Sequence, residues 1–99
     1  MTYRLVYHKL AKRELVEAVK WYEERSAGRG EKFMHAIIAK LAYLQENGDK
    51  YPVTRGYFRE FFVDSYPFII VFRLNRRKKV LFIASVFHTS RNPVNKYRR

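Results

Sequence analysis

The sequence predicts an α+β fold: a two-layer sandwich of order β-α-α-β-β-β, in which a helical hairpin packs on one face of a mainly antiparallel, four-stranded sheet. Two patterns lead to this prediction. In the first half of the chain, apolar residues recur at helical spacing over two adjacent stretches, which a short glycine-containing link joins. The second half holds three runs rich in aromatic and β-branched residues, separated by short polar turns.

The chain begins with a predicted strand and a predicted helix. Residues 2–8 alternate large apolar side chains with others, which is the period of a half-buried strand. From Lys9 the apolar residues change to helical spacing, at Ala11, Leu15, Ala18 and Tyr22. The glycines of RSAGRG (25–30) predict the end of this helix, because glycine adopts left-handed backbone conformations at little steric cost.

The remaining elements are a second helix and three strands. The helix is predicted from about Glu31 to the stop signal NGD at 47–49, and two helices on so short a link form an antiparallel hairpin. Strands are predicted at 56–63, 67–74 and 80–88. Because their connections are short, they form an antiparallel meander, which we expect the first strand to join.

The composition indicates a single domain over residues 1–99. The chain is 47% hydrophobic and 17% aromatic, which is enough for a packed interior. It contains no cysteine, so disulfides and thiol chemistry are excluded and a reducing cytoplasm is favoured. The three histidines lack metal-ligand spacing and no glycine-rich phosphate loop is present, so neither a metal nor a cofactor is predicted. Without a signal peptide or a membrane span in the sequence, we expect a soluble cytoplasmic protein.

The charge of the chain is high and unevenly distributed. The net charge is +12. Residues 1–64 carry twelve basic and nine acidic side chains, whereas residues 65–99 carry nine basic side chains and no acid. This asymmetry predicts an anionic partner for the C-terminal part, either nucleic acid or an acidic protein segment. The alternative is a solvated basic tail.

Three residues in or near the strands are candidates for chemistry. Arg59 and Arg73 are the basic residues inside the second and third predicted strands, where an arginine is costly unless it faces water or an anion. If both face away from the helices, they form a cationic pair near His88, whose imidazole could act as an acid or a base. The alternatives are local pairing of each arginine, for example with Asp64, and a His88 that bonds to the backbone.

The last residues of the chain are candidates for binding. Residues 86–99 contain four Lys or Arg and no acid. Basic and aromatic side chains can clamp a phosphate backbone or stack on a base, which predicts a binding role for a set in this segment: Arg91, Lys96, Tyr97 and Arg98. A frayed terminus is the alternative. The helix aromatics Trp21, Tyr22 and Phe33 are assigned to packing.

Three stretches together resemble a known family. They are AVKWYEERSAGRGEKF, YPVTRGYFREFFVDSYPFIIVFRL and VLFIASVFHTSRNP. In this order and spacing they resemble the RelE/ParE superfamily of toxins from bacterial type II toxin–antitoxin modules, often labelled plasmid stabilisation proteins. The resemblance covers nearly the whole chain, and it implies the same two-layer fold.

The superfamily resemblance implies two possible activities. RelE-like members are ribosome-dependent endoribonucleases that cut mRNA, whereas ParE-like members inhibit DNA gyrase. By position, Arg59 and Arg73 match basic residues of the ribonuclease branch, and His88 falls where the last strand ends near its site. As catalytic residues, these three would supply two cations and one proton-transfer group.

Two departures from the ribonuclease pattern favour the ParE-like branch. The lysine-rich pattern of RelE-like members is absent, since YPVTRGYFREFF offers only Arg55 and Arg59. The ending VFHTSRNP resembles the His-x-x-Arg-x-Pro ending of ParE-like members. We therefore expect a growth-inhibiting, ParE-like toxin that acts on gyrase and is held in check by a cognate antitoxin. The alternatives are a ribonuclease acting on the ribosome and mRNA, and an inactive relative that only binds its antitoxin.

Overall fold

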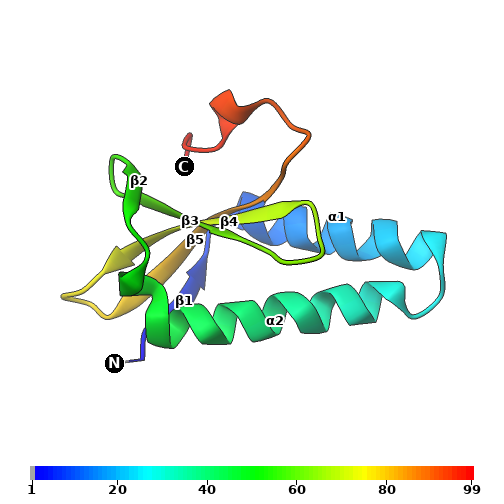
Figure 1. The fold of residues 1–99 in the computed structure, drawn as a ribbon, viewed down its shortest axis with the longest axis horizontal. Coiled ribbons are helices and arrows are strands. Elements are labelled where there is room, and N and C mark those ends of the chain that lie inside the picture. Colours follow the sequence, from blue (N-terminus) through cyan, green and yellow to red (C-terminus); the bar gives the residue numbers. More distant parts are fainter. Residues whose placement is uncertain (1) are drawn as a thin grey trace.

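The computed structural model describes residues 2–99 and has the two predicted layers (Figure 1). One layer is a five-stranded sheet of order β1-β5-β4-β3-β2, and the other is a pair of helices on one of its faces. In chain order the elements are β1 (Arg4–Tyr7), α1 (Lys9–Arg25), α2 (Arg29–Asn47), β2 (Val53–Arg55), β3 (Phe58–Phe62), β4 (Phe68–Asn75) and β5 (Val80–His88), with 3-10 turns at Gly48–Lys50 and Pro93–Asn95.

The sheet has one strand more than the four predicted. The additional strand is β2, which pairs antiparallel with β3 at the edge of the sheet. All three residues of β2 are exposed, so no alternation of buried and exposed side chains marks it in the sequence. The first strand joins the sheet as expected: β1 pairs parallel with β5, and all other pairs are antiparallel.

The helical hairpin is closed by side-chain and backbone contacts at its link. The carboxylate of Glu23 accepts hydrogen bonds from the N–H groups of Gly28 and Gly30, and so caps the first turn of α2. Gly28 has a φ of 87°, which favours glycine. At Gly30, a Cβ would lie 2.6 Å from the carbonyl oxygen of Val19, so only glycine permits this approach of the two helices.

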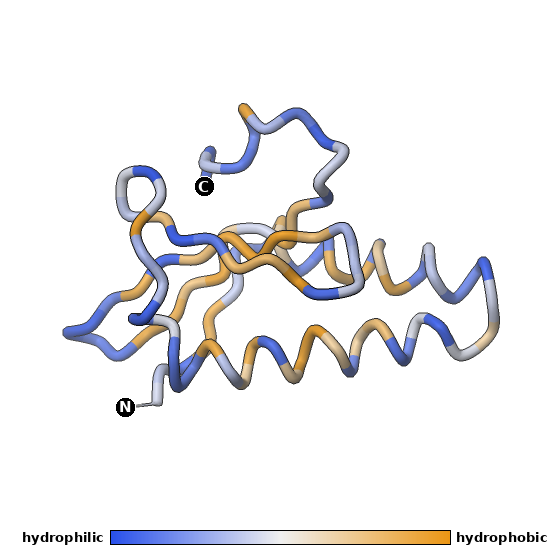
Figure 2. Tube along the Cα trace, in the orientation of Figure 1, coloured by the Kyte–Doolittle hydropathy of each residue, from blue (hydrophilic) through white to orange (hydrophobic). Residues whose placement is uncertain are grey.

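Both faces of the sheet carry a hydrophobic core. The larger core lies between the sheet and the helices, and its fully buried side chains include Phe33, Ile37, Leu44, Ile70, Phe72, Leu81 and Ile83. A smaller core lies on the opposite face and consists of Ile69, Val71, Ala84 and Phe87, with Phe58, Phe82 and Tyr97 packed against it. Apolar residues occur along both the strands and the helices, whereas the β4–β5 turn, residues 76–79, is hydrophilic (Figure 2).

The helix aromatics differ in their surroundings. The ring of Tyr22 packs 4.8 Å from that of Phe33, and Phe33 is fully buried, as predicted. Trp21 is 50% exposed and so is not a core residue, although its ring packs edge-on 5.1 Å from that of Tyr22. The guanidinium of Arg25 lies over the Trp21 ring, 3.9 Å from its centroid. The surface of α1 therefore presents a large aromatic side chain to solvent.

Candidate functional site

The two arginines that were expected to form a cationic pair lie on opposite faces of the sheet. Arg59 is in register with Phe72 of the larger core, and it donates a hydrogen bond to the carbonyl oxygen of Tyr51. Arg73 is in register with Phe82 on the other face, and its guanidinium lies 4.7 Å from that ring. The local-pairing alternative holds for Arg59, although its partner is a carbonyl group rather than a carboxylate.

His88 is remote from both arginines. It ends β5 opposite Phe68, at the other end of β4 from Arg73. Its Nδ1 accepts a hydrogen bond of 3.0 Å from the N–H of Ser90, and its ring packs edge-on 5.0 Å from that of Phe68. The structure thus does not gather the three candidate catalytic residues around one phosphate.

The second face of the sheet is covered by the C-terminal strap, residues 89–99. The strap passes over the face opposite α1 and α2 (Figure 1). The Tyr97 ring lies 5.4 Å from that of Phe58, and the Tyr97 hydroxyl donates a hydrogen bond to the Glu60 carboxylate. Lys96 Nζ lies 3.1 Å from the same carboxylate. The terminus is therefore folded back onto the sheet rather than frayed.

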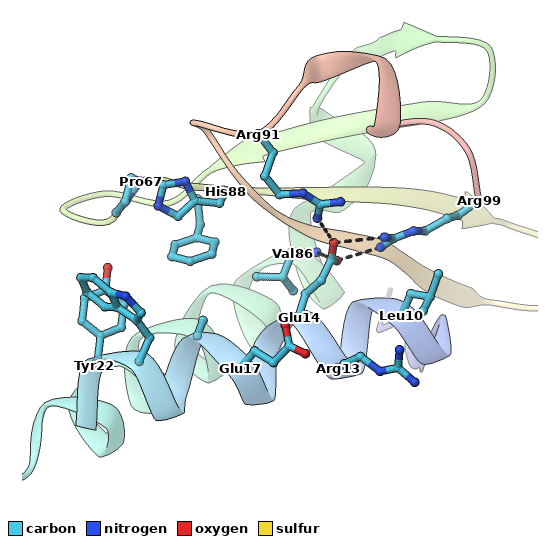
Figure 3. A pocket seen from close by; sticks show the side chains of 13 residues that line it. Leu10, Arg13, Glu14, Glu17, Tyr22, Pro67, Val86, His88, Arg91 and Arg99 are labelled. Atoms are coloured by element: carbon cyan, nitrogen blue, oxygen red, sulfur yellow. Dashed lines mark hydrogen bonds and ion pairs between the residues drawn. The ribbon is translucent and has the colours of Figure 1, made fainter. Parts of the chain in front are cut away.

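A second carboxylate, that of Glu14 on α1, holds both ends of the strap. It accepts hydrogen bonds from Arg91 and from two nitrogens of Arg99, the latter at 2.7 and 3.1 Å (Figure 3). The Ser85 hydroxyl and the Val86 N–H donate to it as well, at 2.9 and 3.0 Å. Burial raises the pKa of Glu14, but hydrogen bonds from Arg99, Ser85 and Arg91 outweigh burial and hold that pKa below its ordinary value.

The position of this cluster follows from the short first strand. β1 pairs only with residues 80–83 of β5, so the rest of that edge has no neighbouring strand. The Glu14 carboxylate accepts a hydrogen bond from the Val86 N–H, and Arg99 donates one to the Ala84 carbonyl oxygen at 3.0 Å. Side chains of the helix and the strap thereby satisfy backbone groups that a longer β1 would have bonded.

A pocket of about 520 Å³ lies between α1 and the ends of β4 and β5 (Figure 3). Its apolar lining consists of Leu10, Ala18, Trp21, Tyr22, Pro67, Phe68 and Val86. Charged side chains complete the lining: Arg13, Glu14, Glu17, Arg91 and Arg99, with His88 beside them. An apolar floor with charged surroundings is suited to the side chains of a protein partner.

The four predicted binding residues lie together on the strap but differ in their availability. Arg91, Lys96 and Tyr97 each bond to a carboxylate of the chain itself, whereas Arg98 is exposed. The sequence reasoning missed the two carboxylates, Glu14 and Glu60. The available signal was an acid at an otherwise apolar position, in a chain with a large excess of cations.

Two structural features bear on membrane and metal binding. Among residues 2–99, no helix is long and apolar enough to cross a membrane. In the same range, no group of three or more His, Asp or Glu side chains is placed to hold a metal ion.

The helical hairpin on a mainly antiparallel sheet is the architecture implied by the RelE/ParE resemblance, so the fold agrees with that superfamily. Residues 5–93 match the family model described as the ParE toxin of the type II toxin–antitoxin system parDE. The chain belongs to this ParE toxin family.

The fold has a close structural counterpart. A chain from the structure titled "Chromosomal ParDE TA system from P. aeruginosa" superimposes with a TM-score of 0.77 and 17% sequence identity. The match covers 90% of this chain and 98% of that chain. At this identity the likeness concerns the fold alone. No curated protein sequence matches the chain.

Proposed function

We propose that this ParE-family toxin acts in the cytoplasm, inhibits DNA gyrase by protein–protein contact, and is held in check by a cognate antitoxin. The observation that carries the proposal is the separation of Arg59, Arg73 and His88. Cleavage of RNA requires an acid, a base and preorganised cations around one phosphate. Arg59 and Arg73 point to opposite faces of the sheet, which favours a binding protein over a ribonuclease.

The strap supports the same choice. A ribonuclease of this superfamily is expected to receive RNA on the sheet face opposite the helices. In this chain Lys96 and Tyr97 of the strap lie across that face and bond to Glu60. RNA would have to break these bonds to reach Arg73, whose guanidinium packs against Phe58 and Phe82. A protein target can instead be met by the outer surface of the strap, where Arg98 is exposed.

The pocket beside α1 supports a protein antitoxin. Its apolar lining and the exposed Trp21 suit apolar side chains of an amphipathic partner segment. The net charge of +12 favours a partner that is acidic in part. An antitoxin that folds on binding would cover apolar and basic surface together.

Inducible expression in a bacterial host tests the target, with chromosome breakage and mRNA cleavage followed in the same culture. The proposal predicts broken DNA and intact mRNA, and inhibition of supercoiling when the purified chain is added to purified gyrase. Cut mRNA with intact chromosomes would identify a ribonuclease instead. Unaffected growth, with antitoxin binding retained, would identify an inactive relative.

Two sets of variants locate the activity on the molecule. The double variant Arg73→Ala, His88→Ala removes two of the candidate catalytic residues, and full toxicity is expected to persist. Arg98→Glu reverses an exposed charge of the strap that makes no ion pair among residues 2–99. It is expected to weaken gyrase inhibition without loss of folding. If only the double variant abolishes toxicity, the gyrase proposal fails.

A further inference from the structure

One end of the sheet carries a dense group of basic side chains, here called the basic end. Its centre is the β4–β5 turn, where four consecutive cations, residues 76–79, are all exposed. The flanking strand β1 adds the exposed Arg4, which is in register with Val80 at the start of β5. Arg73 of β4 is not a member, because its guanidinium packs against Phe58 and Phe82. The complete set is Arg4, Arg76, Arg77, Lys78 and Lys79.

The cations of the basic end have no ion-pair partner among residues 2–99. Two acids lie towards this end of the molecule. Glu46 accepts a hydrogen bond from the Thr2 hydroxyl, and Asp49 lies in the 3-10 turn whose Gly48 packs beside Leu74 and Leu81. Neither forms an ion pair with the basic end, which therefore keeps an excess of positive charge. Such an excess of like charge raises the potential at the surface and attracts anions.

The cations are not needed to build the turn. Its geometry depends on the Asn75 side chain, which accepts a hydrogen bond of 3.0 Å from the Lys78 N–H. The Arg4 N–H donates to the Lys79 carbonyl oxygen at 2.8 Å, which ties the turn to β1 through the main chain. Lys79 has a φ of 54°, where glycine or asparagine would fit with less strain. The chain therefore places a charge where the backbone alone favours a different residue.

From this arrangement we infer that the basic end binds the phosphate backbone of duplex DNA. The turn is hydrophilic (Figure 2), and the apolar pocket lies elsewhere, beside α1. A protein segment gains most of its affinity from apolar and aromatic anchors, whereas phosphate binding requires clustered cations. The turn offers clustered cations and lacks apolar anchors, which distinguishes it from the pocket and the strap.

The inference deepens the proposed function. Gyrase acts on duplex DNA, so a toxin bound to the enzyme would also contact the DNA segment that the enzyme holds. Contact with the DNA held by gyrase rests on the proposed function. DNA binding by the basic end is argued from its exposed cations and is independent of the proposed function.

The test compares two variants of equal charge by fluorescence anisotropy on a short duplex of mixed sequence. The first carries Arg76→Gln, Arg77→Gln, Lys78→Gln and Lys79→Gln. The control carries four exposed substitutions on the helices: Lys12→Gln, Lys20→Gln, Arg29→Gln and Lys32→Gln. Each lost phosphate contact lowers the slope of log affinity against log salt by about 0.9, so the turn variant is expected to lose roughly 3–4 of that slope. It is also expected to bind at least about tenfold more weakly, while the control stays near the parent chain.

Each other outcome overturns the inference. Equal losses in both variants would mean that net charge alone attracts DNA. Unchanged DNA binding by the turn variant, together with lost binding of a polyglutamate peptide, would assign the surface to an acidic protein. Circular dichroism and thermal unfolding establish that both variants are folded. A supercoiling assay with purified gyrase is scored separately, so DNA binding without gyrase inhibition would refute only the proposed function.

Discussion

The strap and the β4–β5 turn contain the same types of residue and use them in opposite ways. In the strap, Arg91, Lys96 and Arg99 are matched to two carboxylates. Arg99 and its partner Glu14 are only 10% and 13% exposed. In the turn, the side chains of residues 76–79 are exposed and form no ion pair among the described residues. The comparison shows that a count of cations does not locate a binding surface; the positions of the carboxylates decide which cations remain available.

The largest effect is expected at the Glu14 carboxylate. Glu14→Gln leaves Arg91 and Arg99 without an anion in a largely buried site, which is expected to lower the free energy of unfolding by about 2–4 kcal/mol. Urea unfolding followed by circular dichroism measures it. The matched control is Glu17→Gln, an exposed position on the same helix with the same change of charge. Equal, small losses in both variants would mean that the strap contributes little to stability.

The pH dependence of stability provides a second test of the same contact. Because the pKa of Glu14 lies below its ordinary value of 4.5 in the folded chain, the unfolded chain binds the proton more readily. Its contribution is therefore complete above pH 4.5 and is lost as the pH falls through the lowered pKa. The difference in unfolding free energy between the parent chain and Glu14→Gln should shrink over that range. A difference that stays constant with pH would contradict the assignment.

A smaller effect is expected at Glu60, the second anchor of the strap. Glu60→Gln keeps the shape of the side chain but removes the charge that Lys96 and Tyr97 contact, at an expected loss of about 1–2 kcal/mol. Thermal unfolding measures the loss, with the exposed Glu24→Gln as control. Increased hydrogen exchange of strap amides should accompany it. Unchanged exchange would show that packing of Tyr97 on Phe58 is sufficient to hold the strap.

The smallest effect on stability is expected at the turn. Neutralising all four cations of residues 76–79 should change the free energy of unfolding by about 0.5 kcal/mol or less, because none has an intrachain partner among the described residues. Reduced self-repulsion among the remaining cations favours a small gain. A loss as large as that of Glu60→Gln would mean that the turn cations have a structural role, and the contrast with the strap would disappear.

The layers and most element bounds were predictable because core positions repeat at the helical or strand period. The choice of face was not. In β3, Phe58, Glu60 and Phe62 alternate with Arg59 and Phe61, so both faces carry aromatic residues. Sequence spacing established that Arg59 and Phe61 share a face, and that Glu60 points the other way. It did not indicate which face the helices cover.

Local sequence patterns could not predict the contacts that anchor the strap, because the residues involved are far apart in the chain. Glu14 and Arg99 are 85 positions apart, and Glu60 and Tyr97 are 37 apart. No periodicity links positions so distant, and charge alone allows many pairings. Only the meeting of α1, the open edge of β5 and the strap selects this one.

The pairing of the first strand with the last has a kinetic consequence. Residues 4–7 bond to residues 80–83, and Glu14 bonds to Arg99, so the sheet cannot close until nearly the whole chain has been made. At roughly 5–20 residues per second, synthesis of the chain takes on the order of 5–20 s. During that interval the helical hairpin can form while the sheet and the strap are incomplete. A nascent chain therefore lacks the β1–β5 pairing and the anchored strap until residues 80–99 have been synthesised.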